Sequence, residues 1–282
     1  ACYASLAERY DRPCQPAFAA FAKESHLDGH VILGGDYGQV FRYKDFIDRD
    51  DKAALAQTLA GQIVPMQAQG FLSFLYTAEH FNILATPFHA GIFAVTQNTV
   101  SPEVLAVAVQ EMTLSSQFGF KFSDEFYAGL EVSGIQRRYV QSQAKLLDVF
   151  ADPQNILATN QQRLLYLEPG VAWVNNDPWR FRLSLKLAQL GFIENPNPAL
   201  PTSAVAQWGA GVTVPMDRIY GHLDVLLGWP LSFDPQNAAQ PLRIGATYQY
   251  GLFDGFVAYD PTDFSIGGSA GFNSVKVGIM YK

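Results

Sequence analysis

The feature that most constrains this chain is a strict alternation of apolar and polar residues between Gln162 and Asp260. In residues 180–187, phenylalanine or leucine fills every second position, and arginine, serine or lysine fills the positions between them. The segments that begin at Ala204, Arg218 and Pro241 repeat the pattern. Because successive side chains of a β-strand point to opposite faces, the sequence predicts a large antiparallel sheet with one apolar and one polar face.

Two architectures have such a sheet. In a soluble β-sandwich the apolar faces of two sheets meet, whereas in an outer-membrane barrel the apolar face contacts lipid and the polar face lines a lumen. The alternating segments approach the roughly 9–11 residues of a tilted transmembrane strand, and aromatic residues cluster near their ends. Connections also alternate between short and long, as in barrels. The pattern favours the barrel, and a soluble β-rich secreted or periplasmic protein is the alternative.

We therefore predict an all-β protein, a transmembrane antiparallel meander β-barrel of about 12–14 strands in residues 30–282. Residues 1–29 do not alternate, and their apolar residues, such as Leu6, Tyr10, Phe18 and Phe21, recur at helical spacing. This spacing predicts a short helical N-terminal plug or cap, with a loose arm as the alternative. Strand-by-strand assignment gives about thirteen strands, whereas single-chain bacterial barrels usually have an even number, and it leaves open which rim carries the long loops.

Individual elements follow from the same patterns. The first strand is expected to begin at Val31, a hairpin is expected in residues 71–97, and Ser123-Asp124 is expected to form a tight turn. Helical patterns occupy residues 50–61 and 144–158. Pro87 with Gly91 indicates either a strand kink, which could open a lateral path into the membrane, or a strand that begins after Pro87. Pro169-Gly170 allows the same two interpretations.

Composition narrows the class of protein further. Charged residues make up 16% of the 282 residues, against roughly 25% in ordinary soluble domains, and the formal net charge is −7. This acidic balance argues against nucleic acid as a partner, and no apolar run reaches the roughly 20 residues of a membrane helix. The sequence begins without Met or a signal peptide, which suggests a processed chain.

Cys2 and Cys14 predict one disulfide in an oxidising compartment such as the periplasm, with two unrelated thiols as the alternative.

The polar face supplies the candidate site residues. Charged side chains inside a barrel have two possible roles. They can line a water-filled lumen that conducts small polar solutes, or they can form ion pairs across the lumen that keep the barrel narrow and closed. We favour a narrow or closed interior, because roughly a dozen strands enclose little space. The lumen-facing candidates are Lys121, Glu131, Arg137, Glu168, Arg180, Arg182, Lys186, His222, Asp224, Arg243 and Lys276.

Enzymatic chemistry has little support in the sequence. The five histidines form no two-histidine metal spacing, and none accompanies a serine in a nucleophile-elbow pattern. His222 and Asp224 share the predicted lumen face two residues apart, and with Ser184 on another strand they are one catalytic combination that distant strands could assemble. We expect no enzyme activity, no metal and no cofactor.

Several short stretches resemble the outer-membrane fatty-acid transporter superfamily (FadL-like barrels), and more closely its conjugal-transfer TraF-like branch. The resemblance is one of spacing and turn placement between Val31 and Tyr281. It is carried by Ala78-Glu79-His80, Val100-Ser101-Pro102-Glu103-Val104, Phe118-Gly119-Phe120-Lys121-Phe122-Ser123-Asp124, Tyr127-Ala128-Gly129-Leu130, Leu187-Ala188-Gln189-Leu190-Gly191 and Ala270-Gly271-Phe272. Residues 275–281 also resemble the C-terminal strand signal of outer-membrane proteins, although Lys282 follows the final aromatic residue.

The resemblance implies a barrel of about 12–14 strands with a plug-like N-terminal segment. The expected role is a channel or transporter for small or hydrophobic solutes in the bacterial outer membrane, with the N-terminal segment in the periplasm. The alternative is a plugged structural barrel that forms a homo-oligomeric scaffold or part of a larger outer-membrane machine. Expected partners are membrane lipid, a hydrophobic ligand and further copies of the chain.

Overall fold

The computed structural model describes residues 14–22, 25–35, 65–97, 103–145, 148, 159–175, 179–196, 204–216, 221–232, 243–250, 253–260, 263–272 and 275–281. Among these residues, no helix is long and apolar enough to cross a membrane. The helix with described bounds is a 3₁₀-helix, η3 (Pro16–Phe21).

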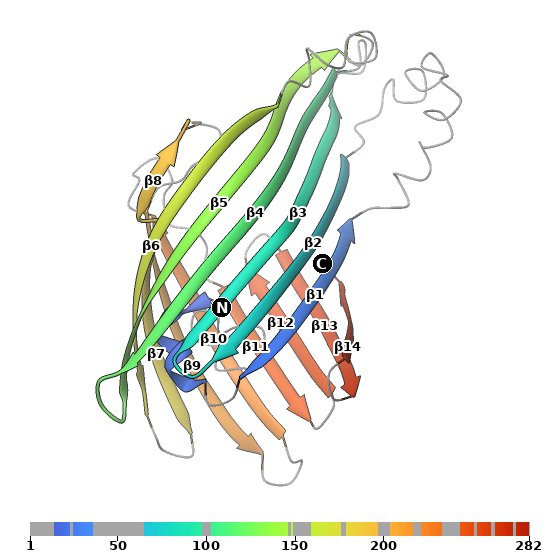
Figure 1. The fold of residues 1–282 in the computed structure, drawn as a ribbon. Coiled ribbons are helices and arrows are strands. Elements are labelled where there is room, and N and C mark those ends of the chain that lie inside the picture. Colours follow the sequence, from blue (N-terminus) through green and yellow to red (C-terminus); the bar gives the residue numbers. More distant parts are fainter. Residues whose placement is uncertain are drawn as a thin grey trace.

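All described strands belong to one 14-stranded antiparallel sheet (Figure 1). Its strands are β1 (His26–Gly35), β2 (Pro65–Ala78), β3 (Phe81–Gln97), β4 (Glu103–Lys121), β5 (Phe126–Lys145), β6 (Asn160–Val174), β7 (Arg180–Ala188), β8 (Gly191–Glu194), β9 (Val205–Met216), β10 (Gly221–Ser232), β11 (Arg243–Tyr250), β12 (Phe253–Asp260), β13 (Asp263–Phe272) and β14 (Val275–Tyr281). Strands adjacent in sequence are adjacent in the sheet, except that β8 pairs with β6 and β9 with β7. The prediction of an all-β antiparallel meander is confirmed.

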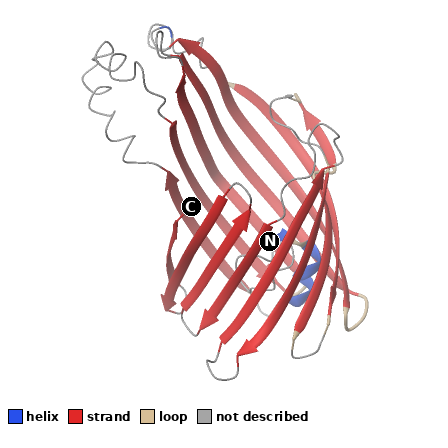
Figure 2. Ribbon diagram, turned by 180° about the vertical axis from the view of Figure 1, so that it is seen from behind, coloured by secondary structure: helices blue, strands red, loops and turns tan. Residues whose placement is uncertain are grey.

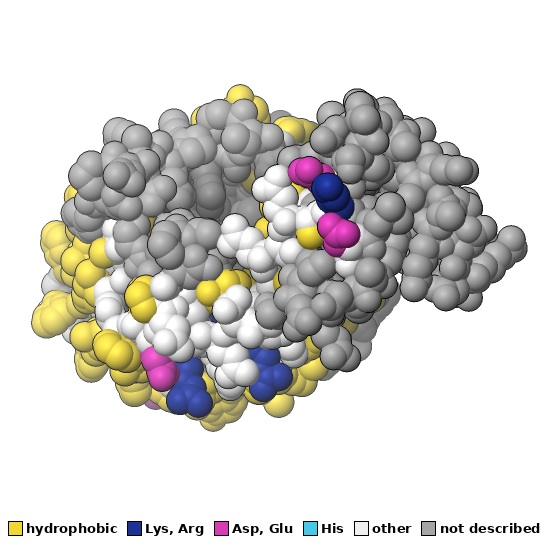
Figure 3. All heavy atoms as spheres, turned by 90° about the horizontal axis from the view of Figure 1, so that it is seen from above, with side chains coloured by type: hydrophobic (Ala, Val, Ile, Leu, Met, Phe, Trp, Pro, Cys, Tyr) yellow, Lys and Arg dark blue, Asp and Glu magenta, His cyan; other side chains and the backbone are white. Residues whose placement is uncertain are grey.

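The sheet curls around η3, which lies on its concave face (Figures 1 and 2). Alternation along each strand decides which side chains face inward: on β5, Tyr127, Glu131 and Ser133 are buried, while Phe126 and Val132 are exposed. Figure 3 shows hydrophobic side chains around the outer margin of the molecule. We call the side that carries η3 the concave face and the other the convex face. Among the described strands, no pairing joins β1 to β14.

The two faces have the opposite polarity to those of a soluble domain. Buried concave-face residues include many polar side chains, among them Ser73, Thr77, Asn82, Ser115, Gln117, Gln162, Arg182 and Lys186. The convex face exposes large apolar side chains on strands from β1 to β13, among them Leu27, Leu33, Phe74, Met112, Leu114, Phe118, Leu165, Leu167, Leu183, Trp208, Val257 and Ile266. The sheet is also taller on one side, because β2–β6 have 14–20 residues and β11–β14 have 7–10.

Several expected elements differ from those observed. The first strand begins at His26, inside the segment expected to be helical, because residues 26–35 pair continuously with β2. The short strand β8 was not predicted, since it follows a residue with positive φ, Gln189, and pairs over only four residues. Residues 144 and 145 belong to β5 rather than to a helix. The other predicted helical residues in 50–61 and 144–158 lie outside the described residues, apart from Asp148, and so does the N-terminal part of segment 1–29.

Candidate functional site

Three glycines on neighbouring strands form a groove on the concave face. Gly119 of β4 is the direct cross-strand partner of Gly129 of β5, and Gly129 is the partner of Gly170 of β6. We call this set the glycine row. Because glycine has no Cβ, three aligned glycines let another backbone approach the sheet closely.

The N-terminal 3₁₀-helix η3 fills this groove. A Cβ at Gly119 would lie within 3 Å of the Ala20 backbone, and one at Gly129 within 3 Å of the Pro16 backbone. At Gly170, the same position is taken by the side-chain amide of Gln15, whose Nε2 donates to the Val171 carbonyl at 3.4 Å. The close approach therefore depends on all three positions being glycine.

Apolar contacts hold η3 on the side of the glycine row nearer the turns. Phe18 and Ala17 pack with Tyr127, Ala172 and Val174 in one buried cluster. The ring of Phe21 lies 4.2 Å from that of Tyr127, measured between centroids. Burial of a Phe side chain contributes about 1.5–3 kcal/mol, so these contacts are a large part of what stabilises the helix in the groove.

A row of polar residues lies immediately beyond the glycine row, two residues further along each strand. Asn82, Gln117, Glu131 and Glu168 are successive cross-strand partners on β3, β4, β5 and β6. Asn82 Nδ2 donates to Gln117 Oε1 at 3.2 Å, and Gln117 Nε2 donates to Glu131 Oε2 at 3.0 Å. Ser133 Oγ donates to Glu131 Oε1 at 3.0 Å. These side chains form a continuous buried hydrogen-bond network.

Lys186 on β7 completes this network. Its Nζ lies 2.7 Å from Glu131 Oε2 and 2.5 Å from Glu168 Oε2, and all three side chains are buried. The backbone N–H of Gln189 donates to the other oxygen of Glu168 at 2.7 Å. One ammonium thus faces two carboxylates in a water-poor environment, where breaking a pair is costly because a charge is left without its partner.

A second polar cluster lies further along the same strands. The guanidinium of Arg137 on β5 pairs with Glu111 on β4, and Glu111 Oε2 also lies 3.3 Å from His89 Nδ1 on β3. Arg137 Nη1 donates to Gln162 Oε1 at 3.4 Å, and Gln162 Nε2 donates to the Asn195 carbonyl at 2.9 Å. The concave faces of β3–β6 are thus cross-linked at two levels.

The structure brings together only part of the predicted lumen-facing set. Glu131, Glu168 and Lys186 meet in one cluster, Arg137 belongs to the second, and Arg182 is buried and donates to Thr213 on β9. Arg180 and Lys121 are exposed, at strand ends beside the tight turns. His222, Asp224, Arg243 and Lys276 lie on described strands, but their side chains fall outside the described residues.

Lys121 belongs to a turn rather than to the polar clusters. Its Nζ lies 2.8 Å from Asp124 Oδ1, and both side chains are largely exposed. The hydrogen bond from this ammonium and its positive charge hold the pKa of Asp124 below the usual value. Tyr127 donates a hydrogen bond to the Asp124 carbonyl at 2.9 Å, which ties the same turn to β5. The predicted turn at Ser123-Asp124 is therefore present and linked to the groove.

Pro87 lies inside β3, so the interpretation that the strand begins after this residue is wrong. The ladder passes over it by a register shift: Thr86 pairs with Thr113, and the next pair towards β4 is His89 with Glu111. A matching irregularity separates Leu72 from Phe74 on the β2 side. Gly91, by contrast, pairs regularly with Val109 and Gln69. Pro169 and Gly170 pair regularly within β6.

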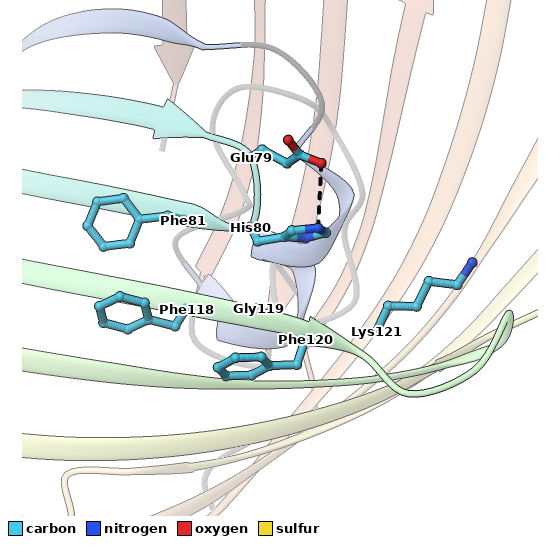
Figure 4. Close-up of a pocket in the computed structure, with 7 residues that line it drawn as sticks. All are labelled: Glu79, His80, Phe81, Phe118, Gly119, Phe120 and Lys121. Atoms are coloured by element: carbon cyan, nitrogen blue, oxygen red, sulfur yellow. Dashed lines mark ion pairs between the residues drawn. The ribbon is translucent and has the colours of Figure 1, made fainter.

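The convex face has an open depression of about 410 Å³ beside the β2–β3 turn (Figure 4). Its walls combine the aromatic rings of Phe81, Phe118 and Phe120 with the polar turn residues Glu79 and His80. The rings of Phe81 and Phe118 lie 4.9 Å apart between centroids, and the Gly119 N–H donates to the His80 carbonyl at 2.9 Å. Gly119 of the glycine row also lines this depression, so the depression adjoins the groove at β4.

Cys14 is half-buried one residue before Gln15, which enters the groove, but Cys2 lies outside the described residues. The Cys2–Cys14 disulfide therefore stays a prediction. Among the described residues, no group of three or more His, Cys, Asp and Glu side chains is placed to hold a metal ion.

Sequence reasoning missed the groove itself. Gly119, Gly129 and Gly170 each occupy an inward position of consecutive strands, and this shared parity was the available signal. Parity alone does not align the three glycines, because alignment depends on the register of two strand pairs.

The sequence was compared with protein-family models and with curated proteins. No protein-family model matches this chain, and no curated protein matches it either.

Proposed function

We propose that this chain is a β-barrel of the bacterial outer membrane that acts as a channel or transporter for small or hydrophobic solutes. The observation that carries the proposal is the inverted polarity of the sheet. Charged residues such as Glu131, Arg182 and Lys186 are buried on the concave face, while Leu114, Leu165 and Leu183 are more than half exposed on the convex face. Water disfavours the exposed apolar side chains of the convex face, whereas a bilayer around that face favours them, and the polar concave face then lines an interior away from lipid.

The height of the apolar surface supports a membrane setting. On β5, the outward residues from Phe126 to Gly134 carry no charge, and the next two outward residues are Gln136 and Arg138. Nine residues of strand span about 27 Å, which becomes about 20 Å along the normal at a tilt near 40°. This height is close to the roughly 25 Å apolar band of outer-membrane barrels.

The other end of this band is aromatic. Phe120, Phe122, Phe126, Trp179 and Phe181 are exposed near the tight turns, as interfacial aromatic residues are in barrels. The η3 groove lies close to these turns, and short turns are usually periplasmic. We therefore infer that the N-terminal segment enters the barrel from the periplasm and sits inside it as a plug, with the sheet closed around it.

Two measurements test this proposal. Membrane-extracted protein should migrate differently in SDS gels before and after boiling, because a closed barrel has no free strand edge and resists SDS until heated. Reconstituted protein should also give steady single-channel conductance, or should swell liposomes in the presence of small sugars. A soluble protein with one gel mobility would overturn the membrane assignment.

A plugged structural barrel is the second candidate, and two observations favour it. The glycine row holds η3 by close backbone contact, and two polar clusters cross-link the strands beside it. If these contacts persist throughout the life of the protein, the interior does not conduct. A heat-modifiable protein that is silent in conductance and migrates as a stable homo-oligomer would favour this scaffold over the channel.

A further inference from the structure

We propose that the convex face of β5 and β6 binds the phosphate headgroup of an anionic membrane lipid through Arg138 and Arg163. This inference rests on the membrane location proposed above and adds a lipid site to it. The site lies where the apolar band ends, on the side away from the tight turns.

The boundary of the apolar band lies at the same register on β5 and β6, and within one outward residue of it on β4. Leu114, Gly134 and Leu165 are cross-strand partners on β4, β5 and β6, and Gly134 and Leu165 are the last outward residues of the band on β5 and β6. The next row along the strands is Met112, Gln136 and Arg163, and the row after it is Gln110, Arg138 and Gln161. The outward surface therefore changes from apolar to polar over one step of the alternation on β5 and β6, and one step later on β4, after Met112.

The polar side of this boundary is cationic. Arg138 is exposed and has no ion-pair partner among the described residues. Arg163 Nη1 lies 3.7 Å from Glu194 Oε2, but both side chains are exposed, by 73% and 49%. An exposed pair at that distance contributes little, so Glu194 leaves the Arg163 guanidinium open to a competing anion. The two arginines and one glutamate carry a net charge of +1.

The spacing of the two arginines suits a phosphate group. Arg138 faces Gln161 across the ladder, and Arg163 faces Gln136, so the arginines are diagonal neighbours with Cα atoms roughly 7–8 Å apart. Both side chains are long enough to converge on one phosphate, and the guanidinium group binds phosphate oxygens in a bidentate manner. The exposed amides of Gln110, Gln136 and Gln161 surround them with further donors.

Continuity with the apolar band identifies the occupant. A soluble phosphate ion would need only the arginines, whereas a lipid also requires an apolar surface directly beneath its headgroup. Leu165 and Leu167 supply that surface on β6, and Leu114 supplies it on β4. A lipid whose acyl chains follow these side chains would place its phosphate at the level of Arg163 and Arg138.

The test measures lipid selectivity in reconstituted vesicles. Spin-labelled phosphatidylglycerol and spin-labelled phosphatidylcholine are compared for the fraction held at the surface of the barrel. The intact protein should prefer phosphatidylglycerol severalfold, since each interfacial arginine contributes roughly a fivefold preference. The variant Arg138→Gln/Arg163→Gln should lower this ratio to about one.

A matched control removes the same charge at the opposite rim. Arg180→Gln/Lys121→Gln deletes two exposed cations near the tight turns and should keep most of the preference. Equal loss in both double variants would show a general charge effect and overturn the site, as would an unchanged ratio in the arginine variant. Inorganic phosphate at millimolar concentration should not abolish the preference, and if it does, the site binds free phosphate rather than lipid.

Gel mobility in SDS, measured on the same samples, separates this inference from the proposed function. A heat-modifiable barrel without selectivity would overturn the lipid site alone. A protein that neither embeds in vesicles nor shows heat-modifiable mobility would overturn both.

Discussion

Lys186 on β7 and Glu131 on β5 form an ion pair of 2.7 Å across the intervening strand β6. The strand between them contributes Glu168, the direct cross-strand partner of Glu131. Two buried carboxylates therefore lie side by side. The ammonium of Lys186 contacts both of them, and its positive charge offsets the repulsion between the two negative charges.

Replacing this lysine should destabilise the sheet strongly. We expect Lys186→Met to lower the free energy of unfolding by about 3–5 kcal/mol, because Glu131 and Glu168 would be left buried without a cation. Urea unfolding of the reconstituted protein, followed by tryptophan fluorescence, measures the effect. Lys186→Met/Glu131→Gln should recover part of the loss, since it removes one of the two charges. A double variant no more stable than the single one would contradict this account.

The glycine row gives a test of how η3 is held. We expect Gly129→Ala to push η3 out of the groove, because the added Cβ would meet the Pro16 backbone. Protease cleavage of the N-terminal segment should become faster, and conductance should rise if that segment plugs the lumen. Gly134→Ala is the matched control, since it lies on the convex face of the same strand with nothing within 4 Å of the new Cβ. Equal protease sensitivity in the two variants would refute a specific role for the groove.

The convex face allows a direct test of the lipid setting. Leu167 is 50% exposed inside the apolar band, one outward position from its edge at Leu165, and Leu167→Arg should cost about 2 kcal/mol in a bilayer, less than the same change at the midplane. The same change at a half-exposed site in water would usually fall within about 0.5 kcal/mol. The folded fraction in vesicles at increasing urea concentration measures the cost. Gln161→Arg, beyond the band on the same strand and face, should cost little.

The predicted Cys2–Cys14 disulfide can be checked by chemical labelling. The unreduced protein, unfolded in denaturant, should not react with a thiol-alkylating reagent, and reduction should make both cysteines reactive. Peptide mass mapping would show the linked pair. Labelling of either cysteine without reduction would contradict the bond and favour two separate thiols.

The sequence determined the local geometry of the sheet. Alternation placed Phe126 and Val132 on one face of β5 and Glu131 and Ser133 on the other, as the structure confirms. It also identified the tight turn at Ser123-Asp124 and most strands, because a period of two is a property of each strand by itself. The ends of strands were predicted less accurately. The first strand begins at His26 rather than at Val31, and β5 continues to Lys145, past the expected start of a helix at residue 144.

Only the tertiary structure decided which residues meet. Gly119, Gly129 and Gly170 lie 10 and 41 positions apart, and they form a groove only because two ladders bring them into one row. The ion pairs of Lys186 depend equally on the register of β5, β6 and β7. Pro87 is accommodated inside β3 because the ladders on both sides shift register around it. Register is set by the combined pairing of whole strands, so a single strand's pattern specifies the face of a residue but not its neighbours.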